Sequence, residues 1–219
     1  MFNKKINIHD LVTIIVTILD ARDPYTYEHS FRVAEYSECI SKSMGLDKAT
    51  HQRVHYAAHL HDIGKTGISD AVLNKPGLLT IKEMKEMQTH SRIGYNILTS
   101  IPIFSSISKI VLYHHERMDG LGYPEGLKGN QIPLESRVIA IADAFDAMTS
   151  NRSYRKAMLA EKALEEINKH KGEQFDPELV DSFNNVYPQL NIQTPDHSIR
   201  QKLRYTNVAH EKLMHSKKR

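Results

Sequence analysis

Hydrophobic residues along this chain recur every three to four positions, which is the spacing of one face of an α-helix. The two-residue alternation that is typical of a half-buried strand is not found in the sequence. The pattern predicts helices over residues 11–21, 26–44, 48–63, 81–98, 102–115, 134–150, 160–170 and 177–186. We therefore expect an all-α fold, in which the helices form a single bundle.

Polar residues and glycines at the predicted helix ends support these boundaries. The N-terminal capping signals are Asp10, Asp47, the capping box of Thr80 and Glu83, and Asp176. Gly45 and Gly64 are expected to end the second and third helices. Residues 65–79 are predicted to form a loop with one helical turn. Residues 119–133 are predicted to form a long Gly-rich loop, and loops of that length usually carry function.

The length and composition of the chain suit one globular domain. Of its 219 residues, 40% are hydrophobic and 25% are charged, which allows a sizeable core. We place the domain at residues 1–187, with its core at about 10–187, and interpret residues 188–219 as a peripheral polar and basic tail. The net charge of +3 is small, so no DNA or RNA partner is expected.

Cysteine usage and hydropathy bear on the location of the protein. The single cysteine, Cys39, excludes an intramolecular disulfide and a cysteine-based zinc site, which suits a reducing compartment. The apolar residues 11–19 are too few to span a bilayer, and no signal peptide follows Met1. The sequence therefore predicts a cytoplasmic protein without membrane association.

Histidine is unusually frequent, with 13 residues, and several histidines lie in patterns that suit metal binding. Donors of nitrogen and oxygen type, from five predicted helices, are His29, His61, Asp62, His90, His114, His115 and Asp143. Asp62 is the natural bridge, because a carboxylate can share its two oxygens between two cations. A donor set without thiolates favours two octahedral divalent ions, such as iron or manganese, over closed structural zinc.

A second histidine pattern offers an alternative metal site. His51, His55 and His59 recur every four residues and share one face of the third predicted helix. His61 and Asp62 point away from that face, so the two sets cannot serve one centre. We favour surface or hydrogen-bonded histidines for the stripe. No role is assigned to the remaining histidines after residue 115, which are His170, His197, His210 and His215.

Five segments, in this order, resemble the motifs of the HD-GYP domain, a branch of the HD superfamily of metal phosphohydrolases. They are EHSFRV (28–33), LHDIGK (60–65), HHERMDGLGYPEGLKGNQIP (114–133), IADAFDAMTSNRSYR (141–155) and FDPELV (175–180). The similarity covers roughly residues 10–187. It implies an HD-type helical bundle. It also implies hydrolysis of a cyclic dinucleotide, chiefly cyclic di-GMP, to linear pGpG or GMP by a hydroxide that bridges two metal ions.

The resemblance assigns roles to the seven donors named above, and none of them is missing. The first ion would be held by His29, His61 and Asp143 and the second by the remaining histidines, with Asp62 bridging both. Some family members carry a glutamate that helps to hold a third metal. Here that position is Tyr25, a poor ligand because its phenol has a pKa near 10, so a third ion would be weakly held.

The resemblance also implies residues for catalysis and substrate binding. Lys65, three residues after Asp62, would stabilise the charge that develops on the phosphate or orient the nucleophile. In the Gly-rich loop, Tyr123 would stack on guanine or bond a phosphate. The substrate-binding set is Gly122, Tyr123, Pro124, Asp146, Arg152 and Arg155. Asp146 is expected to accept from a guanine edge, and the two arginines to contact phosphate or base.

Other functions stay open at this point. The substrate could be the hybrid 3′,3′-cyclic GMP-AMP, or the enzyme could be a broader nucleotide phosphohydrolase. A protein of another class would sense the dinucleotide or dock on a diguanylate cyclase or another protein of bacterial signalling. Such a module is expected to have lost metal ligands, which this sequence retains. A homodimer is also open. The first helix is predicted to begin about ten residues after Met1, so no input domain is expected ahead of it.

Overall fold

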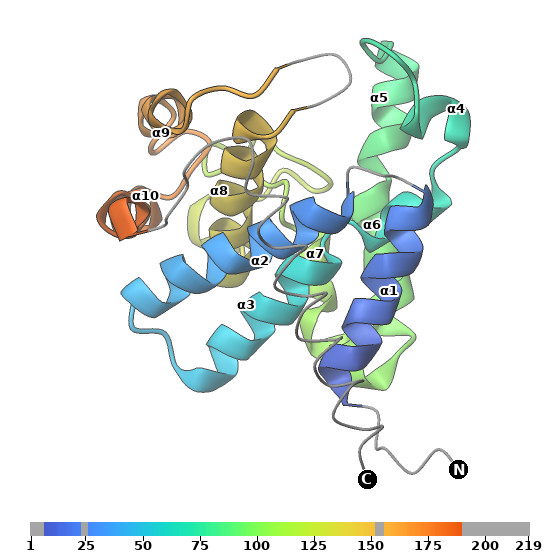
Figure 1. Ribbon diagram of the computed structural model, residues 1–219, viewed down its shortest axis with the longest axis horizontal. Helices are drawn as coiled ribbons and strands as arrows, with labels where there is room; N and C mark the ends of the chain where they lie inside the picture. Colours follow the sequence, from blue (N-terminus) through green and yellow to red (C-terminus); the bar gives the residue numbers. More distant parts are fainter. Residues whose placement is uncertain (1–6, 23–25, 152–155, 190–219) are drawn as a thin grey trace, which may run out of the picture.

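Helices account for all the regular elements of the computed structural model, which describes residues 7–22, 26–151 and 156–189 (Figure 1). The α-helices are α1 Ile8–Arg22, α2 Thr26–Ser43, α3 Lys48–Leu60, α4 Asp70–Leu73, α5 Ile81–Gln88, α6 His90–Thr99, α7 Ser108–Leu112, α8 Leu134–Thr149, α9 Ala160–Lys169 and α10 Pro177–Val186. The 3-10 segments are η1 Ile63–Gly67, η2 Pro102–Ile107, η3 Gly129–Gln131 and η4 Tyr187–Gln189. The predicted all-α fold is confirmed.

The centre of the bundle is α2, which packs along α3 and α8. Figure 1 shows α9 and α10 on one side of these helices and α1, α4, α5 and α6 on the other. Val33 and Ile40 of α2, Val54 of α3 and Phe145 of α8 are all fully buried, in one hydrophobic core. The intervals of three and four residues between such positions produced the helix predictions, because they place apolar side chains on one face.

The predicted helix 81–98 is instead two helices that meet at Thr89. The amide of Thr89 bonds to the carbonyl of Glu86 at 3.0 Å, three residues back, which is the tighter 3-10 type of turn. The Thr89 hydroxyl donates to the same carbonyl at 2.6 Å. The break makes His90 the first residue of α6.

The predicted helix 102–115 is shorter and less regular than expected. A 3-10 segment, η2, precedes α7, and α7 ends at Leu112. His114 and His115 therefore lie in the turn after the helix, where the amide of Glu116 bonds to the carbonyl of Tyr113 at 3.0 Å. Neighbouring side chains in a regular helix point about 100° apart. In the turn after α7, by contrast, the side chains of His114 and His115 can face one centre.

Two other predicted helix ends are also corrected. The third helix ends at Leu60, so His61 and Asp62 lie beyond it and Gly64 is inside η1. The first helix begins at Ile8, before Asp10, whose amide is capped by the Asn7 side chain at 2.8 Å. The other three caps are confirmed, since Asp47, Thr80 and Asp176 each accept a bond from an amide of the first turn.

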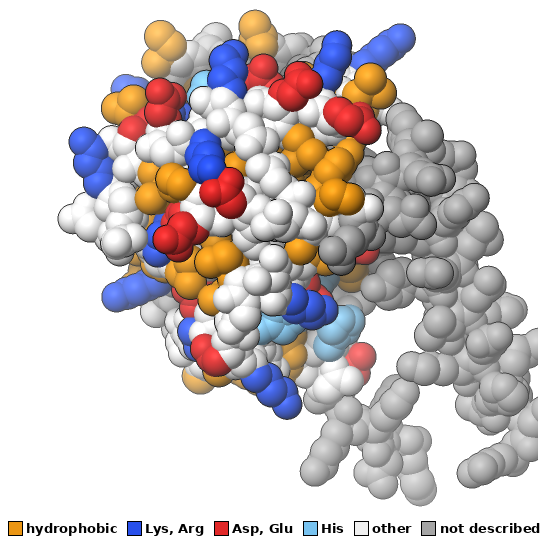
Figure 2. Space-filling model, turned by 90° about the vertical axis from the view of Figure 1, so that its left-hand side faces the viewer, with side chains coloured by type: hydrophobic (Ala, Val, Ile, Leu, Met, Phe, Trp, Pro, Cys, Tyr) orange, Lys and Arg blue, Asp and Glu red, His pale blue; other side chains and the backbone are white. Residues whose placement is uncertain are grey.

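The surface carries charges of both signs. On the face shown in Figure 2, Lys and Arg side chains alternate with Asp and Glu side chains among the described residues. Among those residues, no helix is long and apolar enough to cross a membrane. Residues 190–219, most of the predicted basic tail, lie outside the described residues.

We predict that Gly64→Ala will lower the free energy of unfolding by at least about 3 kcal/mol, because the added methyl group would clash with neighbouring backbone atoms. A Cβ on Gly64 would lie 1.8 Å from the carbonyl oxygen of His90 and 2.5 Å from the amide nitrogen of Gly94, both in the backbone of α6. Chemical denaturation measures the change.

The matched control is Gly129→Ala, where a Cβ meets nothing within 4 Å and only the positive φ of 51° opposes the substitution. It should cost about 1 kcal/mol. Equal stability of Gly64→Ala and the wild type would contradict the close packing of η1 on α6.

Candidate metal centre

The seven predicted metal ligands lie together, although they come from distant parts of the chain. Three overlapping groups each have donor atoms within 4.8 Å of one another, and these groups are His29, His61 and Asp143; His61, Asp62 and His114; and His90, His114 and His115. Most of the donors lie where an element begins or ends. Residue 90 begins α6, residues 61–62 follow α3, and residues 114–115 follow α7.

Three of the histidines are oriented by the carbonyl three residues before them. The Nδ1–H groups of His61, His90 and His114 donate to these carbonyls, at 2.7, 2.8 and 2.6 Å. This tautomer follows from the acceptor, and it leaves Nε2 with its lone pair directed into the centre. The Nε2 atom of His61 is buried and makes no hydrogen bond of good geometry with the described residues. Such an inward-facing, unsatisfied nitrogen suits a metal ligand.

Asp62 lies at the middle of these imidazoles. Its Oδ2 is 3.4 Å from Nε2 of His61 and 3.7 Å from Nε2 of His29, while its Oδ1 is 3.5 Å from Nε2 of His90. Lys65 Nζ lies 2.7 Å from Oδ2. Burial opposes ionisation, but the Lys65 ammonium and the imidazoles hold the pKa of Asp62 well below its usual range. Asp62 is therefore an anion whose two oxygens face different histidines.

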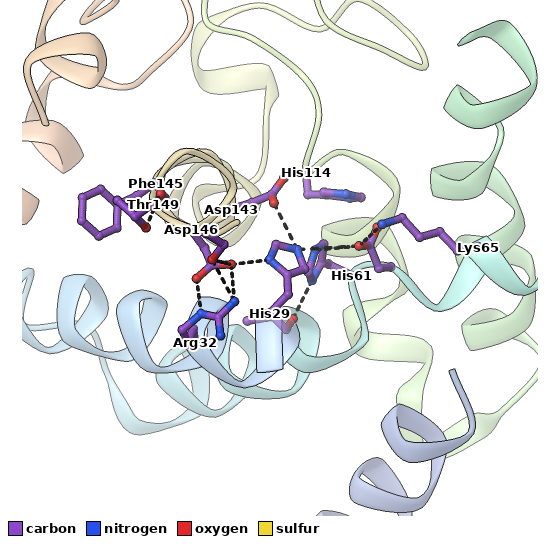
Figure 3. Close-up of polar contacts among 12 residues, drawn as sticks. His29, Arg32, His61, Lys65, His114, Asp143, Phe145, Asp146 and Thr149 are labelled. Atoms are coloured by element: carbon purple, nitrogen blue, oxygen red, sulfur yellow. Dashed lines mark hydrogen bonds and ion pairs between the residues drawn. The ribbon is translucent and has the colours of Figure 1, made fainter. Parts of the chain in front are cut away.

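Two carboxylates and an arginine hold the imidazole of His29 in position. Its Nε2 is 3.3 Å from Oδ1 of Asp143, and its Nδ1 is 2.7 Å from Oδ2 of Asp146 (Figure 3). Arg32, one turn along α2, donates to both Asp146 oxygens at 2.5 and 3.1 Å and to the Ser150 hydroxyl at 2.9 Å. Asp146 is only 1% exposed. These partners differ from the guanine edge that the sequence predicted, and they make Asp146 a residue that orients His29.

Burial sets the ionisation of the other imidazoles. Burial, together with neighbouring histidines, lowers the pKa of His115 to about 3 and lowers that of His114 well below its usual value. Burial also lowers the pKa of His90. Neutral imidazoles bind metal and imidazolium does not, so these three side chains are in the ligand form at neutral pH. The carboxylates beside His29 act in the opposite direction and, against the effect of burial, raise its pKa to about 9. A donor set of imidazoles and carboxylates fits divalent cations.

The Gly-rich loop is attached directly to the segment that carries the adjacent histidines. Glu116 is buried, and its carboxylate accepts from the amides of Glu125, Gly126 and Leu127 at 2.7, 3.1 and 3.0 Å. A Cβ on Gly122 would lie 2.6 Å from the carbonyl oxygen of His115, so only glycine allows this approach. Pro124 follows in the same loop, after a cis bond.

The Tyr123 ring lies beside His90 and His115, which belong to the group of three histidines. Its ring centroid is 4.8 Å from that of His115 and 6.4 Å from that of His90. Burial and the nearby Asp143 and Asp62 raise the pKa of Tyr123, so its phenol keeps its proton. The loop therefore places an aromatic face and a hydroxyl donor beside the metal centre. Asp119 supports the loop by accepting from the Leu121 amide at 3.0 Å.

The comparisons with known proteins agree with this centre. Residues 13–179 match the HD domain family. The chain belongs to the HD domain family. The order of its motifs assigns it to the HD-GYP branch. A cyclic di-GMP phosphodiesterase of Thermotoga maritima is 41% identical over 176 residues, which are 80% of this chain and 48% of that protein. A 3′3′-cGAMP-specific phosphodiesterase of Vibrio cholerae is 38% identical, over 86% of this chain and 42% of that protein.

A solved structure supports the HD fold independently. The crystal structure of a cyclic GMP-AMP specific phosphodiesterase from V. cholerae has a TM-score of 0.64 at 21% identity, covering 87% of this chain and 52% of that one. The HD domain described here thus spans about half the length of the relatives it matches. HD phosphohydrolases are metal-dependent, and the donor groups above are candidates to hold the metal in this HD domain.

The histidine stripe on α3 does not form a second centre of this kind. His51 bonds to the Ser41 hydroxyl at 2.6 Å, and His55 bonds to Glu38 at 2.6 Å. His59 packs against the Phe31 ring, with centroids 4.8 Å apart. Within the part of the chain that the structure describes, the stripe contributes to no convergent group of three donors. The favoured interpretation, surface or hydrogen-bonded histidines, is confirmed for His51 and His55, whereas His59 is buried and its Nδ1 makes no hydrogen bond with the described residues.

The contacts of two arginines of this HD domain, Arg32 and Arg22, were not predicted from the sequence. Arg32 is part of the EHSFRV motif, and its place four residues after Glu28 was a signal only of a helical ion pair. Arg22 bonds to the segment that carries Lys65. The predicted Arg152, Arg155 and Tyr25 lie outside the described residues, so their roles stay predictions.

We predict that Asp146→Asn will weaken metal binding by about 10- to 100-fold, the usual effect of removing the partner that orients a ligand histidine. An amide lacks the charge that aligns His29 and pairs with Arg32. Competition with a chelator, followed by elemental analysis, measures the change. Asp181→Asn, which alters an exposed carboxylate on α10, is the control and should bind metal as the wild type does. Wild-type affinity in Asp146→Asn would contradict the assigned role.

Proposed function

We propose that this HD domain hydrolyses a phosphodiester bond of a cyclic dinucleotide, with cyclic di-GMP as the first candidate. The single observation that carries the proposal is the ionised, buried Asp62, whose two oxygens face different histidine groups. The names of the relatives in T. maritima and V. cholerae support the substrate class. Linear pGpG is the first product, because cleavage of one P–O3′ bond opens the ring, and cleavage of the second bond would give GMP.

The centre is proposed to hold two divalent ions. His29, His61 and Asp143 would hold the first ion, and His90, His114 and His115 the second. Asp62 would contribute one oxygen to each. Iron and manganese are the proposed metals, since the donors are imidazole and carboxylate and thiolate is absent from the donor set. When bound, such ions supply an activated water as nucleophile and neutralise charge on the phosphate.

The residues of the chain have distinct tasks in this reaction. Lys65 is proposed as a catalytic residue, because its ammonium lies beside Asp62 and would face the phosphoryl oxygens as their negative charge grows. Asp146 and Arg32 hold His29 in position. Tyr123 would stack on a base or donate a hydrogen bond from its hydroxyl to a phosphate oxygen.

The Gly-rich loop would supply the rest of the substrate site. Gly122 allows the loop to approach the centre closely, and Pro124 shapes the turn after Tyr123. Arg152 and Arg155 are proposed to contact phosphate or base, as expected from the family. Asp146 is not retained in the substrate site, since His29 and Arg32 occupy its oxygens.

A second candidate substrate is 3′,3′-cyclic GMP-AMP. It is favoured by the 38% identity to a V. cholerae phosphodiesterase named for that compound. Both candidates present the same phosphodiester groups to the metal centre and differ in one base, so the loop would discriminate between them. Docking on a diguanylate cyclase, a homodimer and a cytoplasmic location stay predictions from the sequence.

The decisive assay is hydrolysis by anaerobically prepared protein loaded with Fe²⁺ or Mn²⁺. We expect cyclic di-GMP to give pGpG or GMP on chromatography. We expect the double variant His61→Ala, Asp62→Ala to lose at least about 10³-fold in kcat, since it removes ligands of both ions. His51→Ala, which removes a histidine outside the centre, should keep wild-type activity. Cleavage of a mononucleotide with cyclic dinucleotides left intact would refute the proposal, and so would full activity of the double variant.

Glu116→Gln tests the attachment of the loop. A glutamine cannot accept from all three amides of residues 125–127, and one buried amide loses its partner. We expect KM to rise about tenfold, with the metal content unchanged. The control is Glu173→Gln, at an exposed position, which should leave KM unchanged. An unchanged KM in Glu116→Gln would contradict a role of this loop in substrate binding.

A further inference from the structure

Arg22, in the last turn of α1, makes an unusual set of contacts with a segment more than forty residues away. Its guanidinium donates to the carbonyl of Lys65 at 3.2 Å and also to the carbonyls of Thr66 and Ile68. Its Nε donates to Asp70 at 3.0 Å. One side chain thus binds three backbone carbonyls within four residues, in and just after η1, and the planar fork of arginine suits such a task.

Two of these carbonyls, those of Thr66 and Ile68, need a partner from outside the segment. η1 is a five-residue 3-10 helix, and a helix end leaves its last carbonyls without partners of their own. The backbone bond from the Ile68 amide to the Lys65 carbonyl, 3.1 Å long, closes the segment. 3-10 geometry is weak, so the segment depends on its surroundings. A cation at a helix C-terminus also opposes the negative end of the helix dipole.

The segment that Arg22 binds is the one that positions Lys65. Its start follows Asp62, which the metal ligands surround, and Gly64 packs against the backbone of α6. Its end is bonded by Arg22. Lys65 lies between these two attachments, with its Nζ 2.7 Å from Asp62 Oδ2. The lysine side chain is long and flexible, so the place of its ammonium depends on a fixed backbone.

We infer that Arg22 is a positioning residue for the reaction, which holds the backbone of Lys65 so that its ammonium stays at Asp62 and the phosphate. The inference rests on the role proposed above for Lys65. It gives α1 a function, because none of the seven ligands lies on α1. Asp70 is 75% exposed and contributes little to the same contact, since an exposed ion pair is weak.

The first test measures the backbone directly and does not depend on activity. In the metal-loaded protein, Arg22→Ala should speed amide hydrogen exchange in residues 63–68 by at least about tenfold. Residues 90–99 of α6 should exchange as in the wild type, and metal content should be unchanged. The control Asp70→Asn keeps the bonds to the carbonyls and should exchange at residues 63–68 as the wild type does. Unchanged exchange at residues 63–68 in Arg22→Ala overturns the inference.

The second test asks whether Arg22 acts through Lys65. Arg22→Ala should lower kcat per metal-loaded chain about tenfold with KM unchanged, and Lys65→Ala should lower it about 100-fold. The kcat of the double variant Arg22→Ala, Lys65→Ala should equal that of Lys65→Ala within about twofold. Without Lys65, there is no ammonium whose position Arg22 could fix. Multiplicative losses in the double variant, or a normal kcat in Arg22→Ala, overturn the inference while leaving the proposed function intact. If the wild-type protein cleaves no cyclic dinucleotide, the proposed function fails and the exchange result alone decides the inference.

Discussion

The carboxylate of Asp62 is the constraint on which the rest of this structure depends. A buried anion is costly unless cations or donors surround it. Here the Lys65 ammonium and the imidazoles of His29, His61 and His90 surround the Asp62 carboxylate, with N–O distances of 2.7 to 3.7 Å. Bringing His29, His61 and His90 to a single carboxylate fixes how α2, α3 and α6 meet. The fold can be understood as the packing that allows these side chains to converge.

Convergence is achieved by placing ligands at the ends of helices. The inward-facing Nε2 atoms of His61, His90 and His114 require their Nδ1 atoms to bond the carbonyl three residues back. Those carbonyls are available because the helix ends or changes type there. The same geometry lets adjacent residues 114 and 115 face one centre and continue directly into the Gly-rich loop, three amides of which donate to Glu116.

The sequence predicted most of the helices and the seven side chains that lie together at the centre, because both leave local signals: apolar periodicity for the helices, and motif residues for the seven side chains. It did not predict the break at Thr89 or the early end at Leu112. Both depend on short-range bonding that competes with a continuing helix. Arg22 and Arg32 act across 43 and 114 residues of sequence, and periodicity carries no information about such contacts. Asp146 was predicted to bind substrate, and its actual partners, His29 and Arg32, could be known only from the packing of α2 on α8.

The two-metal proposal places the carboxylate of Asp62 between two metal positions. The most direct measurement is the anomalous diffraction of crystals of the anaerobically metal-loaded protein, collected at the absorption edge of iron or manganese. We expect two peaks, one among His29, His61 and Asp143 and the other among His90, His114 and His115, with Asp62 between them. A single peak, or peaks held by other residues, would contradict it.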